Sequence, residues 1–306
     1  MAIANKLDLA KTSLLGLSIG DALGETFFGP ADIIAARIND RILQEGTWFF
    51  TDDTIMAIGV YNHLSLFGMI NQDALAFEFA GNYRKDNCRG YGAIAQKILR
   101  DITAGIYWKR ASRDVFDGMG SAGNGAAMRS GPIGAYFYED AARVIREATL
   151  AAEVTHAHPE GIAGGIAVAL AACVCTRSRL AGVKLSADTF YDFIIYQMPS
   201  SDVRAKIQKA KTLPAGYDVR TIVSVLGNGT DLTAQDTVPF ALWCAANHTD
   251  SFVEAIWKGI SGLGDRDTIA AIIGSIVVMS AGLKSIPEQW LIQVEPFRTS
   301  PFYKGG

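Results

Sequence analysis

The spacing of apolar residues constrains the fold most, because they recur every three or four positions along most of the chain. Alternating strand-like runs are scarce, and β-branched stretches such as 221–225 are too short to build a sheet. We find no linker and no fixed-period repeat. We therefore predict an all-α fold, a compact orthogonal bundle of roughly a dozen or more helices in one domain spanning residues 1–306. The predicted helical segments are 7–23, 52–67, 72–85, 92–105, 123–137, 139–154, 160–177, 187–198, 201–211, 235–247, 250–259 and 266–283.

Composition excludes several classes of protein. Apolar residues make up 49% of the 306 residues and charged residues 19%, so the chain is not disordered. Four irregularly spaced cysteines suit neither a disulfide framework nor a four-ligand zinc site. The net charge of −3 argues against a nucleic-acid partner. The best apolar stretch, 268–283, is too short for a membrane span, and the N-terminus lacks a signal-peptide pattern. We expect a cytoplasmic protein that binds neither nucleic acid nor membrane.

Glycines are frequent for a helical protein, at 31 residues. Gly16, Gly20 and Gly24 are spaced four apart and so lie on one side of the first predicted helix. One interpretation is close packing against another helix, and the other is an approach of backbone to a ligand. The spacing is not that of a dinucleotide-binding glycine loop, and no strand precedes it.

Two short acidic clusters each open a long apolar helix. The first is Thr51-Asp52-Asp53-Thr54, and the second is 264–268, which contains Asp265, Asp267 and Thr268. Helix capping explains one oxygen-bearing side chain per helix, whereas each cluster offers three or more. Paired, the clusters would form an all-oxygen ligand set, which suits Mg²⁺ or Mn²⁺ rather than zinc or copper. Whether they meet in space is a hypothesis at this stage.

Two further segments carry polar groups beside glycines. In the segment 121–129, Gly123 and Gly125 would let backbone N–H groups surround an anion, although an ordinary turn before a helix is the alternative. The segment 155–161 contains His156 and His158, which either contact a polar substrate or bond to backbone where Pro159 starts a helix. As the only such pair, these histidines lack the further ligands of a zinc site.

Taken in order, these elements resemble the ADP-ribosylglycohydrolase family. The matching segments are GLSIGDALG (16–24), WFFTDDT (48–54), RGYG (89–92), SAGNGAAMR (121–129), THAHPEGIAG (155–164), TAQDTVPFALW (233–243) and GDRDT (264–268). The resemblance implies an all-α fold with two Mg²⁺ ions in a cleft, Mn²⁺ being the alternative ion. It also implies hydrolysis of the bond between the anomeric carbon of ADP-ribose and a protein side chain. We also expect a monomer. An ADP-ribose-containing small molecule is the alternative substrate.

The resemblance also implies roles for individual residues of this sequence. The implied metal ligands are Thr51, Asp52, Asp53, Asp265, Asp267 and Thr268. The implied substrate-binding residues are Ser121, Gly123, Asn124, Gly125, His156 and Tyr91. The implied catalytic residues are Asp53, Asp265 and Glu25.

Three positions depart from the family pattern. Phe28 stands where many relatives have a Glu, and Glu25 could substitute for it only after a rearrangement of the loop. Arg266 places a cation between two implied metal ligands. Arginine-specific relatives carry an acid near RGYG, for which Asp86 is the nearest candidate. We expect a hydrolase that acts first on ADP-ribosylated arginine. The alternatives are a catalytically impaired ADP-ribose-binding module and a hydrolase of another ADP-ribosyl linkage.

Overall fold

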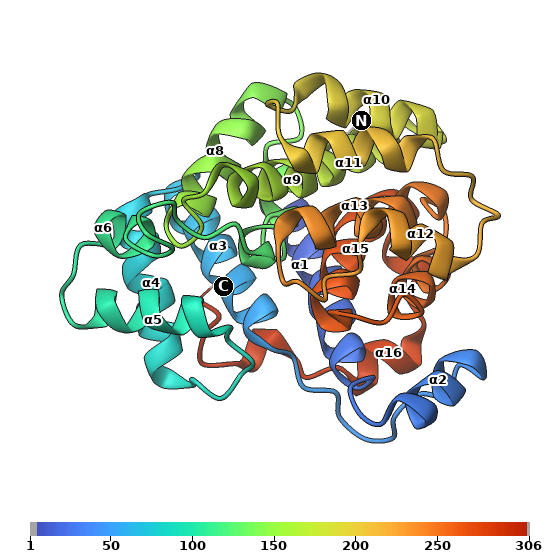
Figure 1. The fold of residues 1–306 in the computed structure, drawn as a ribbon, viewed down its shortest axis with the longest axis horizontal. Helices are drawn as coiled ribbons and strands as arrows, with labels where there is room; N and C mark the ends of the chain where they lie inside the picture. The colour runs from blue at the N-terminus through green and yellow to red at the C-terminus, as the bar shows by residue number, and fades with distance from the viewer. Residues whose placement is uncertain (1–4, 305–306) are drawn as a thin grey trace.

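The computed structural model describes residues 5–304, and within them sixteen α-helices are joined by loops and three short 3₁₀ turns, with no strand (Figure 1). The all-α prediction is confirmed. The α-helices are α1 Lys6–Glu25, α2 Ala31–Asn39, α3 Asp52–Phe67, α4 Gln72–Lys85, α5 Ala93–Thr103, α6 Trp108–Arg113, α7 Gly131–Tyr136, α8 Ala141–Glu153, α9 Pro159–Ala181, α10 Ala187–Gln197, α11 Asp202–Lys211, α12 Val219–Leu226, α13 Ala234–Asn247, α14 Phe252–Ile260, α15 Arg266–Ala281 and α16 Glu288–Gln293. The 3₁₀ turns are η1 Asn124–Ala126, η2 Leu283–Ser285 and η3 Phe297–Thr299.

The helices α1 and α15 cross at the centre of the fold with their backbones in contact. A Cβ atom added to Gly20 would lie 2.0 Å from the Ala270 carbonyl oxygen, and one added to Gly274 would lie 2.1 Å from that of Gly16. At Gly24 the nearest atoms belong to the first turn of α15, Arg266 and Asp267. The glycine spacing therefore serves helix packing, the first of the two interpretations. It also fixes where the acidic start of α15 lies.

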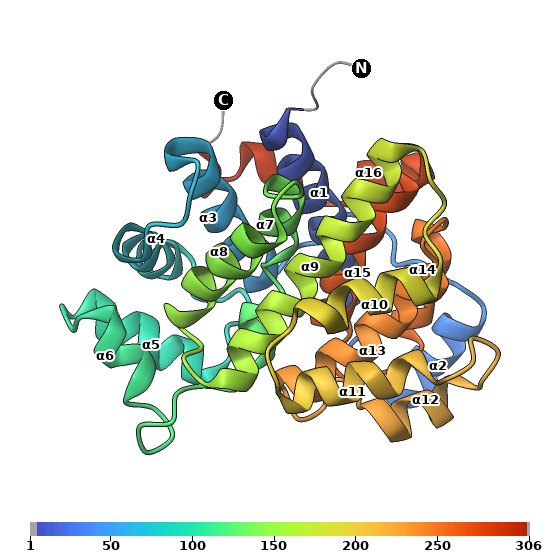
Figure 2. The same cartoon turned by 90° about the horizontal axis from the view of Figure 1, so that it is seen from above.

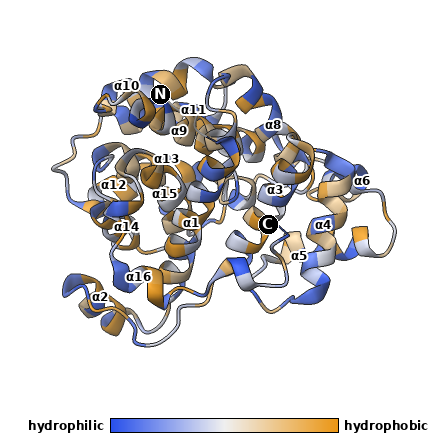
Figure 3. Cartoon of the chain, turned by 180° about the vertical axis from the view of Figure 1, so that it is seen from behind, coloured by the Kyte–Doolittle hydropathy of each residue, from blue (hydrophilic) through white to orange (hydrophobic). Residues whose placement is uncertain are grey.

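The remaining helices surround this pair. Figures 1 and 2 place α4, α5 and α6 on one side of α1 and α15 and the helices α12 and α14 on the other. Figure 3 shows hydrophobic residues over much of α1, α13 and α15. The buried side chains of all these groups belong to one continuous apolar core.

The helix α9 is the one described helix long and apolar enough to cross a membrane, with a mean hydropathy of 1.6 in its best window. The sequence analysis singled out 268–283 instead. Because 83% of that α9 window is buried inside the fold, α9 is accounted for as a core helix.

The sequence predicted some segments wrongly. A continuous helix over 123–137 is not present, because the chain forms only the turn η1 and the six-residue helix α7 there. Four helices were not predicted, α2, α6, α12 and α16, and the β-branched stretch 221–225 lies within α12. Of these, α2 buries only Ile34, so it has almost no apolar face to detect.

Candidate active site

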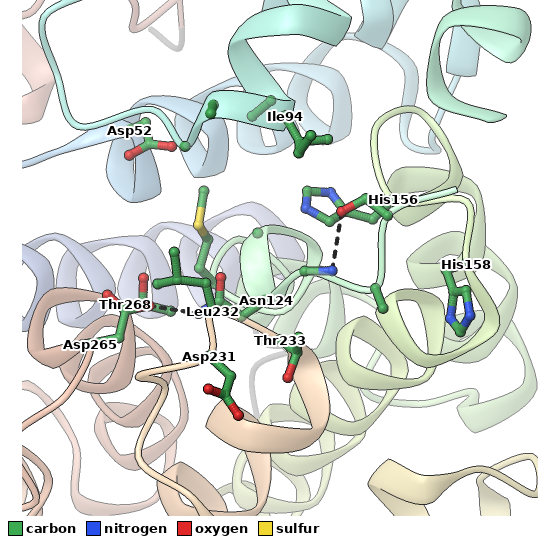
Figure 4. A pocket seen from close by; sticks show the side chains of 18 of the residues that line it. Asp52, Ile94, Asn124, His156, His158, Asp231, Leu232, Thr233, Asp265 and Thr268 are labelled. Carbon is green, nitrogen blue, oxygen red and sulfur yellow. Dashed lines mark hydrogen bonds between the residues drawn. The ribbon is translucent and has the colours of Figure 1, made fainter. Parts of the chain in front are cut away.

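One pocket of about 560 Å³ lies where the starts of α3 and α15 face each other (Figure 4). Figure 4 shows Asp52 on one wall and Asp265 and Thr268 on the opposite wall, with Asn124 and Leu232 next to Thr268 and His156 farther along. Of the predicted site residues, the following line the pocket: Asp52, Asp53, Ser121, Gly123, Asn124, Gly125, His156, Asp265, Asp267 and Thr268. The structure therefore brings together segments that are distant in sequence.

The two acidic clusters meet directly. The Thr268 hydroxyl oxygen lies 3.5 Å from Asp53 Oδ1, across 215 residues of sequence. Burial, followed by the charges of neighbouring carboxylates including Asp267, raises the pKa of Asp52 and of Asp53. Burial, and then Asp267, raises the pKa of Asp265 to about 8. Buried carboxylates this close together remain ionised only where positive charge compensates them.

Helix capping accounts for one part of these clusters. The Thr51 hydroxyl accepts a hydrogen bond from the Asp53 N–H and so caps α3. Thr51 is buried and does not line the pocket. At α15, by contrast, the cap residue Asp265 makes no side-chain capping bond. Its carboxylate Oδ2 instead accepts a bond of 2.6 Å from the Asn124 amide. Capping therefore does not explain the acids of the second cluster.

Asp21 is a site residue that sequence reasoning missed. It is fully buried in α1, and its carboxylate accepts hydrogen bonds from the backbone N–H groups of Thr51 and Thr54. It also accepts from both hydroxyls, at 2.8 Å from Thr51 and 2.5 Å from Thr54. Asp21 thereby ties the start of α3 to α1. The available signal was a single acid within the small and apolar residues of GLSIGDALG.

The donor set fits a hard divalent cation. The buried atoms Asp53 Oδ2 and Asp267 Oδ1 have no hydrogen-bond partner within residues 5–304. Unpaired buried carboxylate oxygens are costly unless a donor or a cation completes them. No group of three or more His, Cys, Asp or Glu side chains in this part of the chain is already gathered tightly enough to hold a metal ion. The oxygens thus share a pocket and lack partners, and carboxylate and hydroxyl oxygens are the ligands that hard divalent cations prefer.

The glycine-rich segment lies beside these acids. Asn124 donates to Asp265 and, at 3.0 Å, to the Thr237 hydroxyl, so the segment is tied to α13 and α15. The expected helix N-terminus is absent, because only the turn η1 follows. Two of the N–H groups are already used, that of Gly123 by the Ser121 hydroxyl and that of Asn124 by the Leu232 carbonyl. An anion here would meet fewer free N–H groups than the sequence suggested.

The two histidines have different environments. His158 caps α9, since its Nδ1 accepts from the Glu160 N–H at 3.1 Å and α9 begins at Pro159. This confirms the structural interpretation for His158, although its side chain also lines the pocket. His156 is buried against the glycine segment and bonds to the Thr155 hydroxyl at 2.7 Å.

Besides Thr51, two predicted site residues lie outside the pocket lining. Tyr91 is 3% exposed and packs edge-on against Tyr83, while its neighbours Gly90 and Gly92 line the pocket. The structure therefore does not support a substrate contact by the Tyr91 ring. Glu25 lies at the end of α1, and its pKa is raised to about 7 by burial first and by Asp267 second. It is therefore near the carboxylates without lining the cavity.

The departures from the family pattern have defined partners. The Arg266 guanidinium carbon lies 4.8 Å from the centre of the Phe28 ring, and neither residue lines the pocket. Asp86 is engaged by Arg89 Nε at 2.8 Å and by the Cys88 N–H at 3.2 Å. Asp86 is thus not a free carboxylate at the pocket mouth.

Sequence reasoning also missed much of the apolar lining. Phe116, Met119, Ile94 and Leu232 all line the pocket. The side chains of Phe116 and Met119 are more than half exposed. Phe116 and Leu232 have left-handed backbone angles, with φ of +52° and +54°. Periodicity does not reveal such loop positions, because the backbone conformation of the loop sets which way their side chains point.

Comparison with known proteins gives one consistent result. A family model described as ADP-ribosylglycohydrolase matches residues 2–301. ADP-ribosylhydrolase ARH3 of Homo sapiens is 29% identical over 94% of this chain and 89% of its own length, and that of Bos taurus is 30% identical over 94% and 88%. ADP-ribosylarginine hydrolase Tri1 of Serratia proteamaculans is 25% identical over 94% and 75%.

Structural comparison agrees. A solved ADP-ribosylglycohydrolase-related protein complex superposes with a TM-score of 0.68 at 23% identity, over 96% of this chain and 94% of that one, which shows the same fold. Since the family model covers nearly the whole sequence, the chain belongs to the ADP-ribosylglycohydrolase family and is a hydrolase.

Proposed function

We propose that this protein is a Mg²⁺-dependent enzyme that removes ADP-ribose from a modified protein side chain and so reverses mono-ADP-ribosylation. The observation that carries the proposal is the meeting of two acidic helix starts, 215 residues apart, in one pocket with the glycine-rich segment. Two ions would be held by Asp52 and Asp53, with Thr51, on one side and by Asp265, Asp267 and Thr268 on the other. Mn²⁺ is the alternative ion.

The bound ions would supply Lewis-acid polarisation of the ribose hydroxyls and of water. The residues of the chain supply the rest of the chemistry. Breaking the glycosidic bond develops positive charge at the anomeric carbon, which the carboxylates of Asp53 and Asp265 stabilise. One of these two takes the proton from the attacking water. Glu25, exposed at the end of α1 and close enough to Asp267 for that charge to raise its pKa, is the third candidate for proton transfer.

The residues that would position the substrate lie in and beside the glycine-rich segment. Ser121, Asn124 and the two glycines of the segment, together with His156, would hold the pyrophosphate and so locate the sugar by contacts remote from the reacting carbon. The exposed faces of Phe116 and Met119 offer apolar surface that suits a flat base.

Arginine is the first linkage to test, as one relative is named an ADP-ribosylarginine hydrolase. A second candidate is hydrolysis of an oxygen linkage. It is favoured by the position of Asp86, which does not line the pocket and is already paired with Arg89.

The test is release of ADP-ribose from proteins modified on arginine and on hydroxyl side chains, with Mg²⁺, with Mn²⁺ and with EDTA. We expect release with metal, loss with EDTA, and loss in Asp267→Asn. The matched control Asp250→Asn removes an exposed carboxylate paired with Lys184 and keeps activity. Equal release with EDTA, or no release from any linkage, contradicts the proposal. Binding of ADP-ribose without turnover identifies an impaired binding module instead.

We further propose that the enzyme acts as a monomer in the cytoplasm. Light scattering coupled to size-exclusion chromatography tests the first point, since a monomer has a molar mass of 32.8 kDa. Cell fractionation tests the second.

A further inference from the structure

A buried arginine lies behind the glycine-rich segment. Arg129 is fully buried. Its guanidinium carbon lies 4.7 Å from the centre of the Phe79 ring. One nitrogen, Nη1, donates to the Gly125 carbonyl at 2.9 Å. The other, Nη2, donates to the Ala151 carbonyl at 2.8 Å and to the Thr155 hydroxyl at 2.9 Å. Because a guanidinium only donates, the Thr155 oxygen is the acceptor in the last of these bonds.

This bond decides where the Thr155 proton goes. The hydroxyl has one proton, it is fully buried, and its other partner is His156 Nδ1 at 2.7 Å. If Nδ1 carried a proton and donated, the Thr155 O–H would have no acceptor within residues 5–304. An unsatisfied buried hydroxyl costs about 1–3 kcal/mol. The satisfied arrangement is Arg129 donating to Thr155, and Thr155 donating to an unprotonated Nδ1.

An unprotonated Nδ1 places the imidazole proton on Nε2. That edge of the ring lies against the glycine segment, since a Cβ atom at Gly123 would be 3.1 Å from Nε2 and one at Gly125 only 2.9 Å. His156 lines the pocket together with these glycines (Figure 4). Burial first, and then the Arg129 charge, lowers the pKa of His156 to about 3. The ring is therefore neutral at physiological pH.

We propose that Arg129 and Thr155 are positioning residues that hold His156 in its Nε2–H tautomer, so that it donates a hydrogen bond to oxygens of the ligand in the pocket. In this role His156 is neither a proton-transfer group nor a metal ligand. The identity of the ligand as ADP-ribose rests on the proposed function, whereas the tautomer does not.

Nitrogen NMR of the imidazoles tests the tautomer directly. The chain has four histidines, so ¹⁵N-histidine labelling gives few signals, and loss of one set in His156→Asn assigns the residue. At pH 7 to 8 the wild type is expected to show a protonated Nε2 and an unprotonated Nδ1 for His156. Thr155→Ser keeps the hydroxyl and this spectrum. Thr155→Val has nearly the same shape without the hydroxyl, and its His156 is expected to lose this fixed tautomer.

Binding gives the second readout. ADP-ribose is expected to shift the Nε2–H signal of the wild type, and its Kd is expected to rise roughly 2- to 10-fold in Thr155→Val but not in Thr155→Ser. A protonated Nδ1 in the wild type overturns the inference, as does an unchanged His156 spectrum in a folded Thr155→Val. If Thr155→Val does not fold, the wild-type and Thr155→Ser spectra still decide. Failure of the wild type to bind ADP-ribose contradicts the proposed function. The NMR spectra still decide the tautomer of His156 in that case.

Discussion

Substitution of Gly20 by alanine tests whether the crossing of α1 and α15 sets the geometry of the site. The new Cβ atom would lie 2.0 Å from the Ala270 carbonyl oxygen, and real Cβ contacts essentially never fall under 3.0 Å. The two helices must therefore separate by about 1 Å at this point. The obstacle is backbone, which cannot move aside as a flexible side chain can.

The magnitude follows from two opposing effects. Overpacking of this kind costs typically about 1–3 kcal/mol, and a contact with backbone belongs at the upper end. Replacing a helical glycine by alanine returns about 1 kcal/mol. We expect Gly20→Ala to lose about 2 kcal/mol of unfolding free energy, which lowers the urea midpoint by roughly 0.7 M for an m-value near 3 kcal/mol/M.

The matched control is Gly81→Ala in α4, where nothing lies within 4 Å of the added Cβ. This variant should be more stable than the wild type by about 0.5–1 kcal/mol. Urea unfolding followed by circular dichroism measures both. A Gly20→Ala midpoint at or above that of Gly81→Ala would refute the reasoning, because the crossing would then tolerate a side chain. Gly24→Ala adds a functional readout, since its Cβ would lie 2.6 Å from the Asp267 Cα. It should weaken Mg²⁺-dependent stabilisation more than Gly20→Ala does.

Three further substitutions separate charge from packing. The ratio of ADP-ribose Kd values between His156→Asn and wild type should stay constant from pH 8 to pH 5.5, because a pKa of about 3 keeps His156 neutral; a tenfold change would show that it titrates. In the unfolded state the His156 imidazole binds a proton below about pH 6.5, whereas in the folded state it does not. Urea unfolding should therefore show that the wild type loses roughly 2 kcal/mol more stability than His156→Asn between pH 6.5 and 5. Asp86→Asn should leave the preference between arginine and hydroxyl linkages unchanged, since Arg89 already occupies that carboxylate; a shift in the kcat/KM ratio would contradict this. Phe28→Glu alone should not raise the rate of hydrolysis, because Arg266 would pair with the new carboxylate. Equal gains in rate in Phe28→Glu and in Phe28→Glu/Arg266→Ala would argue against that pairing.

The sequence predicted best those helices that have both apolar periodicity and residues that mark the helix ends. Helices α3 and α4 begin and end where expected, since Asn71 caps α4 and Gly68 ends α3 in a left-handed conformation. Helix α2 fully buries only Ile34 and has no capping side chain, and so its signal was weak. The segment 123–137 shows the opposite failure, because its alanines and glycines fit a helical pattern while its glycines serve close contacts.

For the site, sequence predicted which acids meet in the pocket better than it predicted the residues around them. The acids were found because each cluster has more oxygen atoms than capping needs, and the structure brings them together. Asp21 was passed over, although a single carboxylate in an apolar helix must have partners. The Arg129–Thr155–His156 chain was beyond reach, since the donor at Thr155 comes from a residue 26 positions away. Such bonds follow from how the residues after η1 meet the end of α8, which no local pattern encodes.

Phe28 and Arg266 look like two independent departures in the sequence, and the structure shows that they touch. A guanidinium placed between Asp265 and Asp267 would compete with a metal ion for those carboxylates if it turned into the pocket. Stacking on the Phe28 ring holds it outside, where the attraction of a cation for an aromatic face contributes about 0.5–2 kcal/mol. A glutamate at position 28 would instead form an ion pair with Arg266 and be neutralised. The aromatic residue is therefore matched to the arginine, and its presence is not by itself a sign of lost catalysis, since Glu25 lies near the same carboxylates and is the remaining candidate for proton transfer.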